Sequence, residues 1–250
     1  MAEASRPVAL ITGAATGVGR ACALRFAESG FDILVNFLGP DLADAEETVS
    51  LVQQRSVHVE KLQCDVSDNA QAMKMAHDAK AKFGKLNVLV NCAGTTHFVD
   101  HADLDAMTEE KWDQILAVNT KGPFFVTRAC FDMLRAACGS IVNVSSVAGV
   151  SGAGSSIAYC ASKGALNTMT KSLARALAPE VRVNAVCPGP IDSAWLRQGM
   201  SEQQIADRVA SFPIPKLAAP SDIADAVHYL ACGTQLTTGQ LLIVDGGRTM

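Results

Sequence analysis

The 250-residue chain has a formal net charge of −4, and 49% of its residues are hydrophobic but only 5% aromatic. A chain of this length can bury a large core, and with so few aromatic residues that core must be aliphatic. An aliphatic core suits parallel strands that are buried on both faces. The acidic balance gives no electrostatic support to nucleic-acid or anionic-membrane binding, and no apolar run approaches the roughly 18–20 residues that span a bilayer.

Short β-branched runs alternate with longer amphipathic runs along nearly the whole chain. We expect strands at 7–12, 32–36, 57–65, 86–91, 140–146, 181–188 and 241–247. Helices are expected at 18–29, 41–54, 69–83, 108–118, 120–137, 157–178 and 221–231. This alternation predicts a doubly wound, parallel α/β sheet of about seven strands, in a single domain over residues 1–250.

The first expected strand leads into a glycine-rich turn, "TGAATGVG", at 12–19. Gly13, Gly17 and Gly19 would let backbone amides approach a pyrophosphate at the start of a helix. A tight turn with a purely structural role is the alternative, but the strand–turn–helix context favours a dinucleotide site.

The second strand ends "VNFLG", where dinucleotide-binding folds usually carry an acidic residue for the adenosine ribose. Asn36, Phe37 and Leu38 supply neither that carboxylate nor a cation for a 2′-phosphate. Arg20 is the nearest basic residue in the turn, and we expect it to point along its helix. The choice between NAD and NADP is therefore poorly encoded here.

The eight cysteines include no C-x-x-C pair, and most of them fall inside apolar elements. They are interpreted as reduced thiols, with no metal site, in a cytoplasmic protein whose N-terminus lacks a signal-peptide pattern. A redox role for Cys160, beside Tyr159, is the less favoured alternative.

Tyr159 and Lys163 lie four residues apart in an expected helix, so both side chains share one face. A cation near the phenol would lower the tyrosine pKa toward values useful for proton transfer. Ser146 closes the preceding strand and could bind the same substrate oxygen, with Ser145 as the rival for that role. A chance Tyr-x3-Lys pair is the alternative to a catalytic pair.

The irregular segment 189–220 holds four prolines and follows the strand expected at 181–188. Because α/β folds bind ligands at the carboxyl ends of their strands, this segment is predicted to be a substrate lid. A surface excursion is the alternative. Trp195, Leu196, Met200 and Phe212 could either line a hydrophobic substrate site or pack the lid on itself.

These motifs, in this order and spacing, resemble those of the short-chain dehydrogenase/reductase family in its compact single-domain branch. The matching stretches are "TGAATGVG", "CDV" at 64–66, "NCAG" at 91–94, "VNTKG" around Asn119, "VSSVAG", "YCASK", "CPGPIDS" at 187–193 and "TTGQLLIVDGG". Cys92 replaces the usual asparagine and Ser193 the usual threonine. The resemblance implies a Rossmann fold and an NAD(P)-dependent oxidoreductase that interconverts a carbonyl and a secondary alcohol.

The resemblance also implies roles for individual residues. Tyr159 would be the general acid/base, Ser146 would orient the substrate oxygen, Lys163 would tune Tyr159 and bind the nicotinamide ribose, and Asn119 would hold a relay water. Trp195 is added to Ser146 and Tyr159 as a candidate substrate contact. The implied cofactor contacts are Gly13, Thr16, Gly17, Val18, Gly19, Phe37, Asp65, Val66, Asn91, Ala93, Gly94, Tyr159, Lys163, Pro188, Gly189, Ile191 and Ser193.

NADP(H) is favoured over NAD(H), because strand ends reading Val-Asn-aromatic resemble those of NADP-dependent relatives. The closest general likeness is to 3-oxoacyl-[acyl-carrier-protein] reductases, and a 3-oxoacyl thioester is the alternative to an unspecified small carbonyl substrate. Arg135 and Arg182 lie near the helix ends where such enzymes commonly carry basic residues to meet an acidic carrier, but Glu180 opposes them.

Three other functions are disfavoured. An epimerase would usually carry a separate substrate domain, a non-catalytic nucleotide sensor would tend to lose part of the catalytic set, and an enoyl reductase would space its tyrosine and lysine further apart. Helices 108–137 and 157–178 match those that pair across subunits in relatives, so a homotetramer, or else a homodimer, is expected by analogy.

Overall fold

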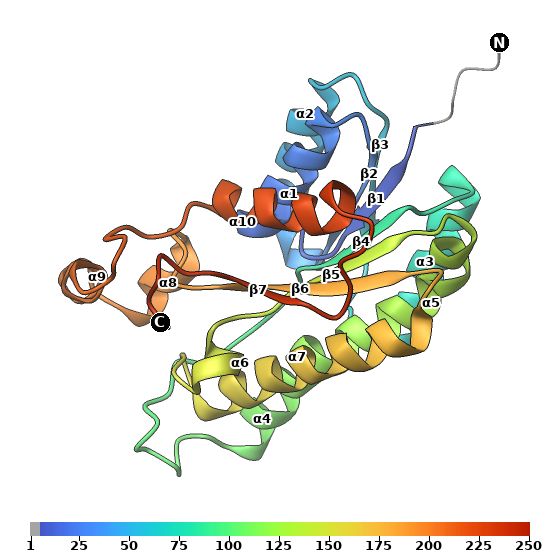
Figure 1. The fold of residues 1–250 in the computed structure, drawn as a ribbon. Helices are drawn as coiled ribbons and strands as arrows, with labels where there is room; N and C mark the ends of the chain where they lie inside the picture. Colours follow the sequence, from blue (N-terminus) through green and yellow to red (C-terminus); the bar gives the residue numbers. More distant parts are fainter. Residues whose placement is uncertain (1–5) are drawn as a thin grey trace.

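A single seven-stranded parallel sheet organises residues 6–250, the part of the chain that this computed structural model describes (Figure 1). Its strand order is β3-β2-β1-β4-β5-β6-β7. The strands are β1 (Val8–Ile11), β2 (Asp32–Phe37), β3 (Val59–Gln63), β4 (Val88–Asn91), β5 (Ser140–Val144), β6 (Arg182–Pro188) and β7 (Leu241–Val244). All seven expected strands are present, and the predicted doubly wound α/β fold is confirmed.

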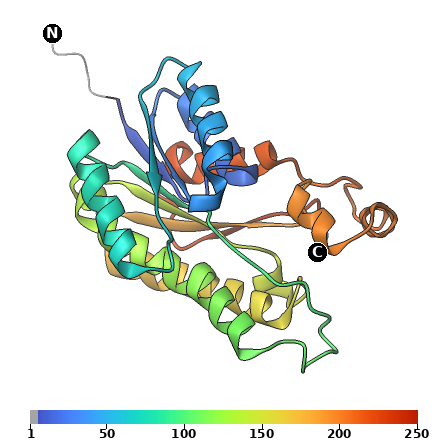
Figure 2. The ribbon, with the colours of Figure 1, turned by 180° about the vertical axis from the view of Figure 1, so that it is seen from behind.

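Helices cover both faces of the sheet, as Figures 1 and 2 show from opposite sides. One face carries α1 (Gly17–Glu28), α2 (Leu42–Gln53) and α10 (Pro220–His228), and the other carries α3 (Asn69–Phe83), α5 (Gly122–Ala136) and α7 (Ile157–Leu177). The short helix α4 (Glu109–Leu116) continues into α5 through a π-helical turn at Ala117–Lys121. No helix within residues 6–250 combines the length and apolarity that a membrane crossing requires.

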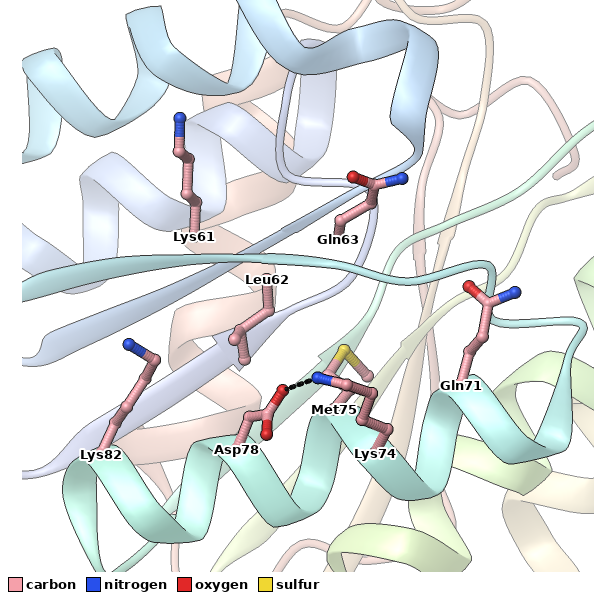
Figure 3. Close-up of a pocket in the computed structure, with 8 residues that line it drawn as sticks. All are labelled: Lys61, Leu62, Gln63, Gln71, Lys74, Met75, Asp78 and Lys82. Carbon is pink, nitrogen blue, oxygen red and sulfur yellow. Dashed lines mark hydrogen bonds and ion pairs between the residues drawn. The ribbon is translucent and has the colours of Figure 1, made fainter.

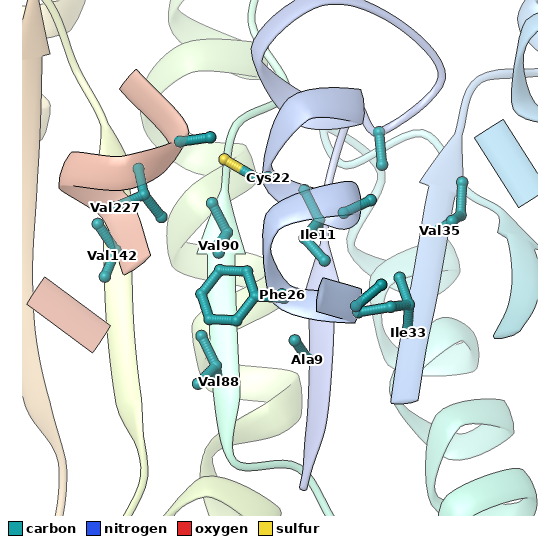
Figure 4. Close-up of a cluster of buried hydrophobic side chains, with 14 of the residues drawn as sticks. Ala9, Ile11, Cys22, Phe26, Ile33, Val35, Val88, Val90, Val142 and Val227 are labelled. Atoms are coloured by element: carbon teal, nitrogen blue, oxygen red, sulfur yellow. The ribbon is translucent and has the colours of Figure 1, made fainter. Parts of the chain in front are cut away.

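The core is aliphatic and divided by the sheet into two layers. Ile11, Val35 and Val90 point toward α1, where Phe26 fills the centre of the layer (Figure 4). Neighbouring strand residues, such as Leu10, face the opposite helices. Because successive strand side chains alternate between faces, nearly every position in these strands must be apolar. That pattern produced the unbroken hydrophobic runs read from the sequence.

The predicted lid is more regular than expected. Within 189–220, the structure contains α8 (Ala194–Gly199) and α9 (Glu202–Ala210). Each begins at a serine whose side chain accepts a hydrogen bond from the helix backbone: Ser193 caps α8, and Ser201 forms a capping box with Gln204. The four prolines indicated irregular chain, but three of them follow α9 rather than interrupt it. A further short helix, α6 (Ala148–Ser151), also escaped prediction.

The strand order reverses direction between β1 and β4, which creates a crevice at their carboxyl ends. There, a Cβ added to Gly13 would lie 2.9 Å from the Cα of Ala93, so the turns after the two strands touch. The Thr12 hydroxyl accepts hydrogen bonds from the amides of Cys92 and Ala93 and ties them together. The predicted site residues gather around this crevice.

Candidate active site

Tyr159 and Lys163 occupy one face of α7 at its N-terminal end. Ser156 caps the helix by accepting a 3.2 Å hydrogen bond from the amide of Tyr159, which fixes that residue in the first turn. The Lys163 side chain is buried and donates from Nζ to the carbonyl oxygen of Val144 at 2.9 Å. Its ammonium lies 5.7 Å from the centroid of the Tyr159 ring, so the phenol and the amine share one pocket.

Burial dominates the electrostatics of this pair. It raises the pKa of Tyr159 to about 12, against the opposing effect of a hydrogen bond with Ser146. It lowers the pKa of Lys163 from 10.5 to about 8. Burial is therefore the largest influence on the Tyr159 pKa in the structure, and the expected lowering of that pKa by Lys163 stays a prediction. A further cation beside the phenol would be needed to favour the phenolate.

The two serines after β5 have different environments. The Ser145 hydroxyl is buried and donates to Oδ1 of Asn167 at 2.6 Å, which joins β5 to α7. Ser146, by contrast, lies close enough to the phenol to lower the pKa of Tyr159, and its hydroxyl accepts from the amide of Ala148 at 3.1 Å. The expected strand 140–146 ends at Val144, so Ser146 stands free of the sheet. The structure therefore brings Ser146, and not Ser145, to the phenol.

Asn119 is fully buried in the π-helical turn between α4 and α5. Its Oδ1 accepts from the amide of Thr95 at 2.8 Å, and its Nδ2 donates to the carbonyl oxygen of Thr95 and to Oγ of Ser162. A Cβ added to Gly94 would lie 3.4 Å from the Asn119 side chain and 3.7 Å from Nζ of Lys163. Asn119 and Lys163 therefore approach the same small space beside Gly94.

The glycine turn has the shape that a dinucleotide pyrophosphate requires. Gly13 and Gly17 have positive φ angles of 62° and 54°, and a Cβ on Gly17 would meet nothing within 4 Å. A Cβ on Gly19 would lie 2.1 Å from the carbonyl oxygen of Gly13, so only glycine allows α1 to begin this close to β1. Thr16 makes no side-chain cap, which leaves the first amides of α1 free for an anion.

Arg20, near the expected adenosine end of the cofactor site, does not point along its own helix as we expected. Nε of Arg20 turns back to the carbonyl oxygen of Ala15, and its guanidinium pairs with Glu47 on α2 at 2.8 Å, rather than following its own helix. Asn36 and Phe37 are buried, and Asn36 Oδ1 accepts from the amide of Gly13. Leu38 is the half-exposed side chain at the end of β2.

The remaining predicted cofactor residues lie in the turns around the crevice. The Asp65 carboxylate accepts from the amide and hydroxyl of Ser67. Asn91 is buried and donates to Asn143 at 2.9 Å. Val18 and Pro188 lie at the ends of α1 and β6, and Ala93 and Ile191 lie just beyond β4 and β6. Val66 packs against Gly122, and Gly189 packs against Asp245. These contacts support the turns that face the crevice.

Sequence reasoning missed Thr12, whose hydroxyl joins the turns after β1 and β4. Its signal was present: a hydroxyl side chain directly before the first glycine. It also missed Phe98 and Gly199. A Cβ on Gly199 would lie 2.1 Å from the Phe98 ring, so these two residues join the loop after β4 to the lid. Their separation of about a hundred residues in the sequence gave no hint of this contact.

A groove of ≈ 450 Å³ between β3 and α3 lies apart from the predicted site. Its lining residues are Lys61, Leu62, Gln63, Gln71, Lys74, Met75, Asp78 and Lys82 (Figure 3). The three lysines pair with Glu46, Asp78 and Glu60. Since their charges are compensated, the groove offers no net attraction for an anion.

Comparison with known proteins agrees with this geometry. A family model described as enoyl-(acyl carrier protein) reductase matches residues 13–249. The chain is 41% identical to a putative ketoacyl reductase 2 of the granaticin polyketide synthase from Streptomyces violaceoruber, over 96% of this chain and 95% of that protein. It is 36% identical to the 3-oxoacyl-[acyl-carrier-protein] reductase FabG of Staphylococcus aureus, over 97% and 98% of the two chains.

Solved structures give the same result. A putative short-chain dehydrogenase/reductase from Burkholderia xenovorans matches with a TM-score of 0.93 at 34% identity, over 98% of this chain and 99% of that one. The chain belongs to the short-chain dehydrogenase/reductase family. It is an NAD(P)-dependent oxidoreductase that acts on a carbonyl or the corresponding alcohol, as its sequence predicted.

Proposed function

We propose that this protein reduces a 3-oxoacyl thioester to the 3-hydroxyacyl thioester, with NADPH as the preferred reductant. The observation that carries the proposal is the placement of the buried Lys163 ammonium 5.7 Å from the centre of the Tyr159 ring, with Nζ held by the carbonyl oxygen of Val144. The names of the curated relatives, ketoacyl reductase and 3-oxoacyl-[acyl-carrier-protein] reductase, support this substrate class.

In the proposed reaction the substrate carbonyl oxygen takes hydrogen bonds from Ser146 and Tyr159. A bound nicotinamide supplies the hydride that reduces the carbonyl carbon. Tyr159 transfers its phenolic proton to the oxygen as negative charge develops there. Lys163 stabilises the resulting phenolate, and the distorted backbone of the π-helical turn at Asn119 holds the water through which the proton is replaced.

Replacing each serine separately tests this assignment. Ser146→Ala removes a donor to the substrate oxygen, and we expect kcat to fall about 10²-fold without a change in fold. Ser145→Ala breaks the link to Asn167, and we expect it to cost about 1–2 kcal/mol of unfolding free energy with little change in kcat. Steady-state kinetics and urea unfolding of both variants measure these effects. The reverse pattern would exchange the two roles.

The preference for NADPH rests on the side chains at the end of β2 and in the glycine turn. Leu38 presents no carboxylate to repel a 2′-phosphate. Thr16, in the glycine turn, is exposed, and its hydroxyl makes no capping hydrogen bond to α1. Arg20 is engaged by Glu47 and contributes no free cation.

We further propose a homotetramer in the cytoplasm. The half-exposed Phe124 on α5, stacked by Arg128, supplies apolar surface on a helix expected to pair between subunits.

Docking of an acidic carrier receives less support. Arg182 donates to the carbonyl oxygens of Leu230 and Ala231, so its guanidinium is already hydrogen-bonded within the protein. Arg135 pairs with Asp132. The substrate is therefore better tested first as a small thioester than as a carrier conjugate.

The decisive experiment combines ligand binding and turnover. A ligand that binds only the folded state raises Tm, so NADPH is expected to give a larger shift than NADH at equal concentration, and Leu38→Asp is expected to reverse the order. Turnover of a 3-oxoacyl N-acetylcysteamine thioester with NADPH would follow, and the matching enoyl thioester serves as the control. Reduction of the enoyl compound alone would overturn the proposed reaction.

A further inference from the structure

Two aromatic side chains lie where the lid meets the body of the protein. Trp195, near the start of α8, lies with its ring centroid 6.1 Å from that of Tyr159, and the two rings are perpendicular. Phe98, in the loop after β4, packs its ring directly on Gly199 at the end of α8. The lid therefore meets the body of the protein through an aromatic contact at each end of one short helix.

The loop that carries Phe98 is fixed at both ends. The amide of Thr95 donates to Asn119, and the amide of Val99 donates to the carbonyl oxygen of Ser155 at 2.9 Å. The hydroxyls of Thr96 and Ser155 are 2.6 Å apart. Because Ser155 lies just before α7, the position of Phe98 is set by the same elements that position Tyr159.

The lid aromatics do not share one role. Phe212 is buried, with the guanidinium of Arg248 over its ring, so it packs the lid against the body. Trp195 and Phe98 keep 40% and 41% of their surface exposed. Large apolar surface left open beside a polar catalytic group marks a place for an apolar ligand.

Charged groups near these rings are already engaged. Arg197, on the same helix as Trp195, pairs with Asp192 at 2.6 Å and with Glu202 at 2.7 Å. His97, next to Phe98, is hydrogen-bonded to Gln114. The described surroundings of the two rings therefore favour an uncharged substituent over a carboxylate or phosphate.

We propose that Trp195 and Phe98 form an aromatic clamp that selects carbonyl substrates carrying an aromatic ring over saturated ones of equal size. An aromatic substituent gains edge-to-face or offset contacts with both rings beyond the area that it buries, whereas a saturated ring gains only burial. Gly199 belongs to the clamp, because any side chain there would displace the Phe98 ring. This inference rests on the proposed function and adds a substrate class to it.

The test compares two 3-oxoacyl thioesters, one ending in a benzyl group and the other in a cyclohexylmethyl group. The methylene keeps the ring out of conjugation with the ketone, so only the inductive effect of the ring remains as a difference in intrinsic reactivity. We expect kcat/KM to favour the benzyl compound about fivefold. Trp195→Phe should keep most of that preference, whereas Trp195→Leu, Phe98→Leu and Gly199→Ala should each reduce the ratio toward one. A ratio near one in the unaltered enzyme, or a ratio that survives Trp195→Leu, would overturn the clamp.

A binding measurement separates failure of the clamp from failure of the proposed reaction. Trp112 is the chain's other tryptophan, so Trp112→Phe leaves Trp195 as the sole indole reporter. Combined with Tyr159→Phe to prevent turnover, this variant should show quenching of Trp195 emission, with a Kd about fivefold lower for the benzyl compound. Tighter benzyl binding without turnover in the unaltered enzyme would reject the proposed reaction and retain the clamp. Turnover of both compounds with equal Kd values would reject the clamp alone.

Discussion

Tyr159→Phe is expected to lower kcat about 10³-fold while the Tm increase caused by NADPH stays within about a degree of the unaltered protein. The phenol is the group proposed to move a proton, and phenylalanine keeps the ring that packs at 6.1 Å from Trp195. Loss of the hydroxyl therefore removes the chemistry and leaves the pocket walls in place. Single-turnover kinetics with a 3-oxoacyl thioester measures the loss.

Tyr229→Phe is the matched control for that change. Tyr229 is the only other tyrosine in the chain, and its side chain is 52% exposed at the end of α10. We expect its replacement to leave kcat within about twofold. Equal losses in the two variants would show that the effect of Tyr159→Phe arises from packing, and near-full activity of Tyr159→Phe would remove Tyr159 from the mechanism.

Lys163→Met is expected to lower kcat about 10²-fold or more and to weaken the Tm shift given by NADPH. Methionine fills a similar volume but supplies neither the charge that stabilises the phenolate nor a donor for the nicotinamide ribose. Lys171→Met, at an exposed position on the same helix, is the control and should leave both quantities unchanged. A variant that retains turnover would show that Lys163 only supports the carbonyl of Val144.

The buried amine also has a consequence for stability against pH. Its pKa is about 8 in the folded protein, against 10.5 when exposed, so between these values the unfolded chain binds more protons. The free energy of unfolding of the unaltered protein should therefore rise relative to Lys163→Met as the pH increases through this window, by up to about 3 kcal/mol. Urea unfolding at about pH 7.5 and 9.5, both below the ordinary tyrosine pKa of about 10, tests the sign. A difference independent of pH would contradict the lowered pKa.

Much of the fold could be predicted because local patterns and the global fold agree. Buried parallel strands such as Val8–Ile11 leave an apolar run with no polar face, and α3 was predicted with its observed bounds, Asn69–Phe83. The lid helices α8 and α9 were not predicted, because they are short and are followed by prolines that indicated irregular chain. The two serines that cap them were therefore not recognised as helix starts. Short helices depend on contacts with the rest of the protein more than on their own propensity.

The site was predictable as far as it depends on spacing along one element. Tyr159 and Lys163 are neighbours on any helix, and the glycines of the turn are close in the sequence. The rest depends on contacts that the sequence cannot rank. Ser145 and Ser146 are chemically identical, and their different neighbours, Asn167 for Ser145 and the Tyr159 phenol for Ser146, separate their roles. The pKa of Tyr159 likewise depends on burial, which the spacing of residues along a helix does not reveal.

Because the turns after β1 and β4 contact each other, the cofactor site can form only after these two strands have paired in the sheet. Thr12 holds the amides of Cys92 and Ala93, some eighty residues further along the chain. A partly folded chain with α7 formed would already place Tyr159 beside Lys163, yet it would have no cradle for the cofactor until β1 and β4 pair. Recovery of cofactor binding during refolding should therefore report completion of the central sheet, whereas recovery of helical signal should come earlier.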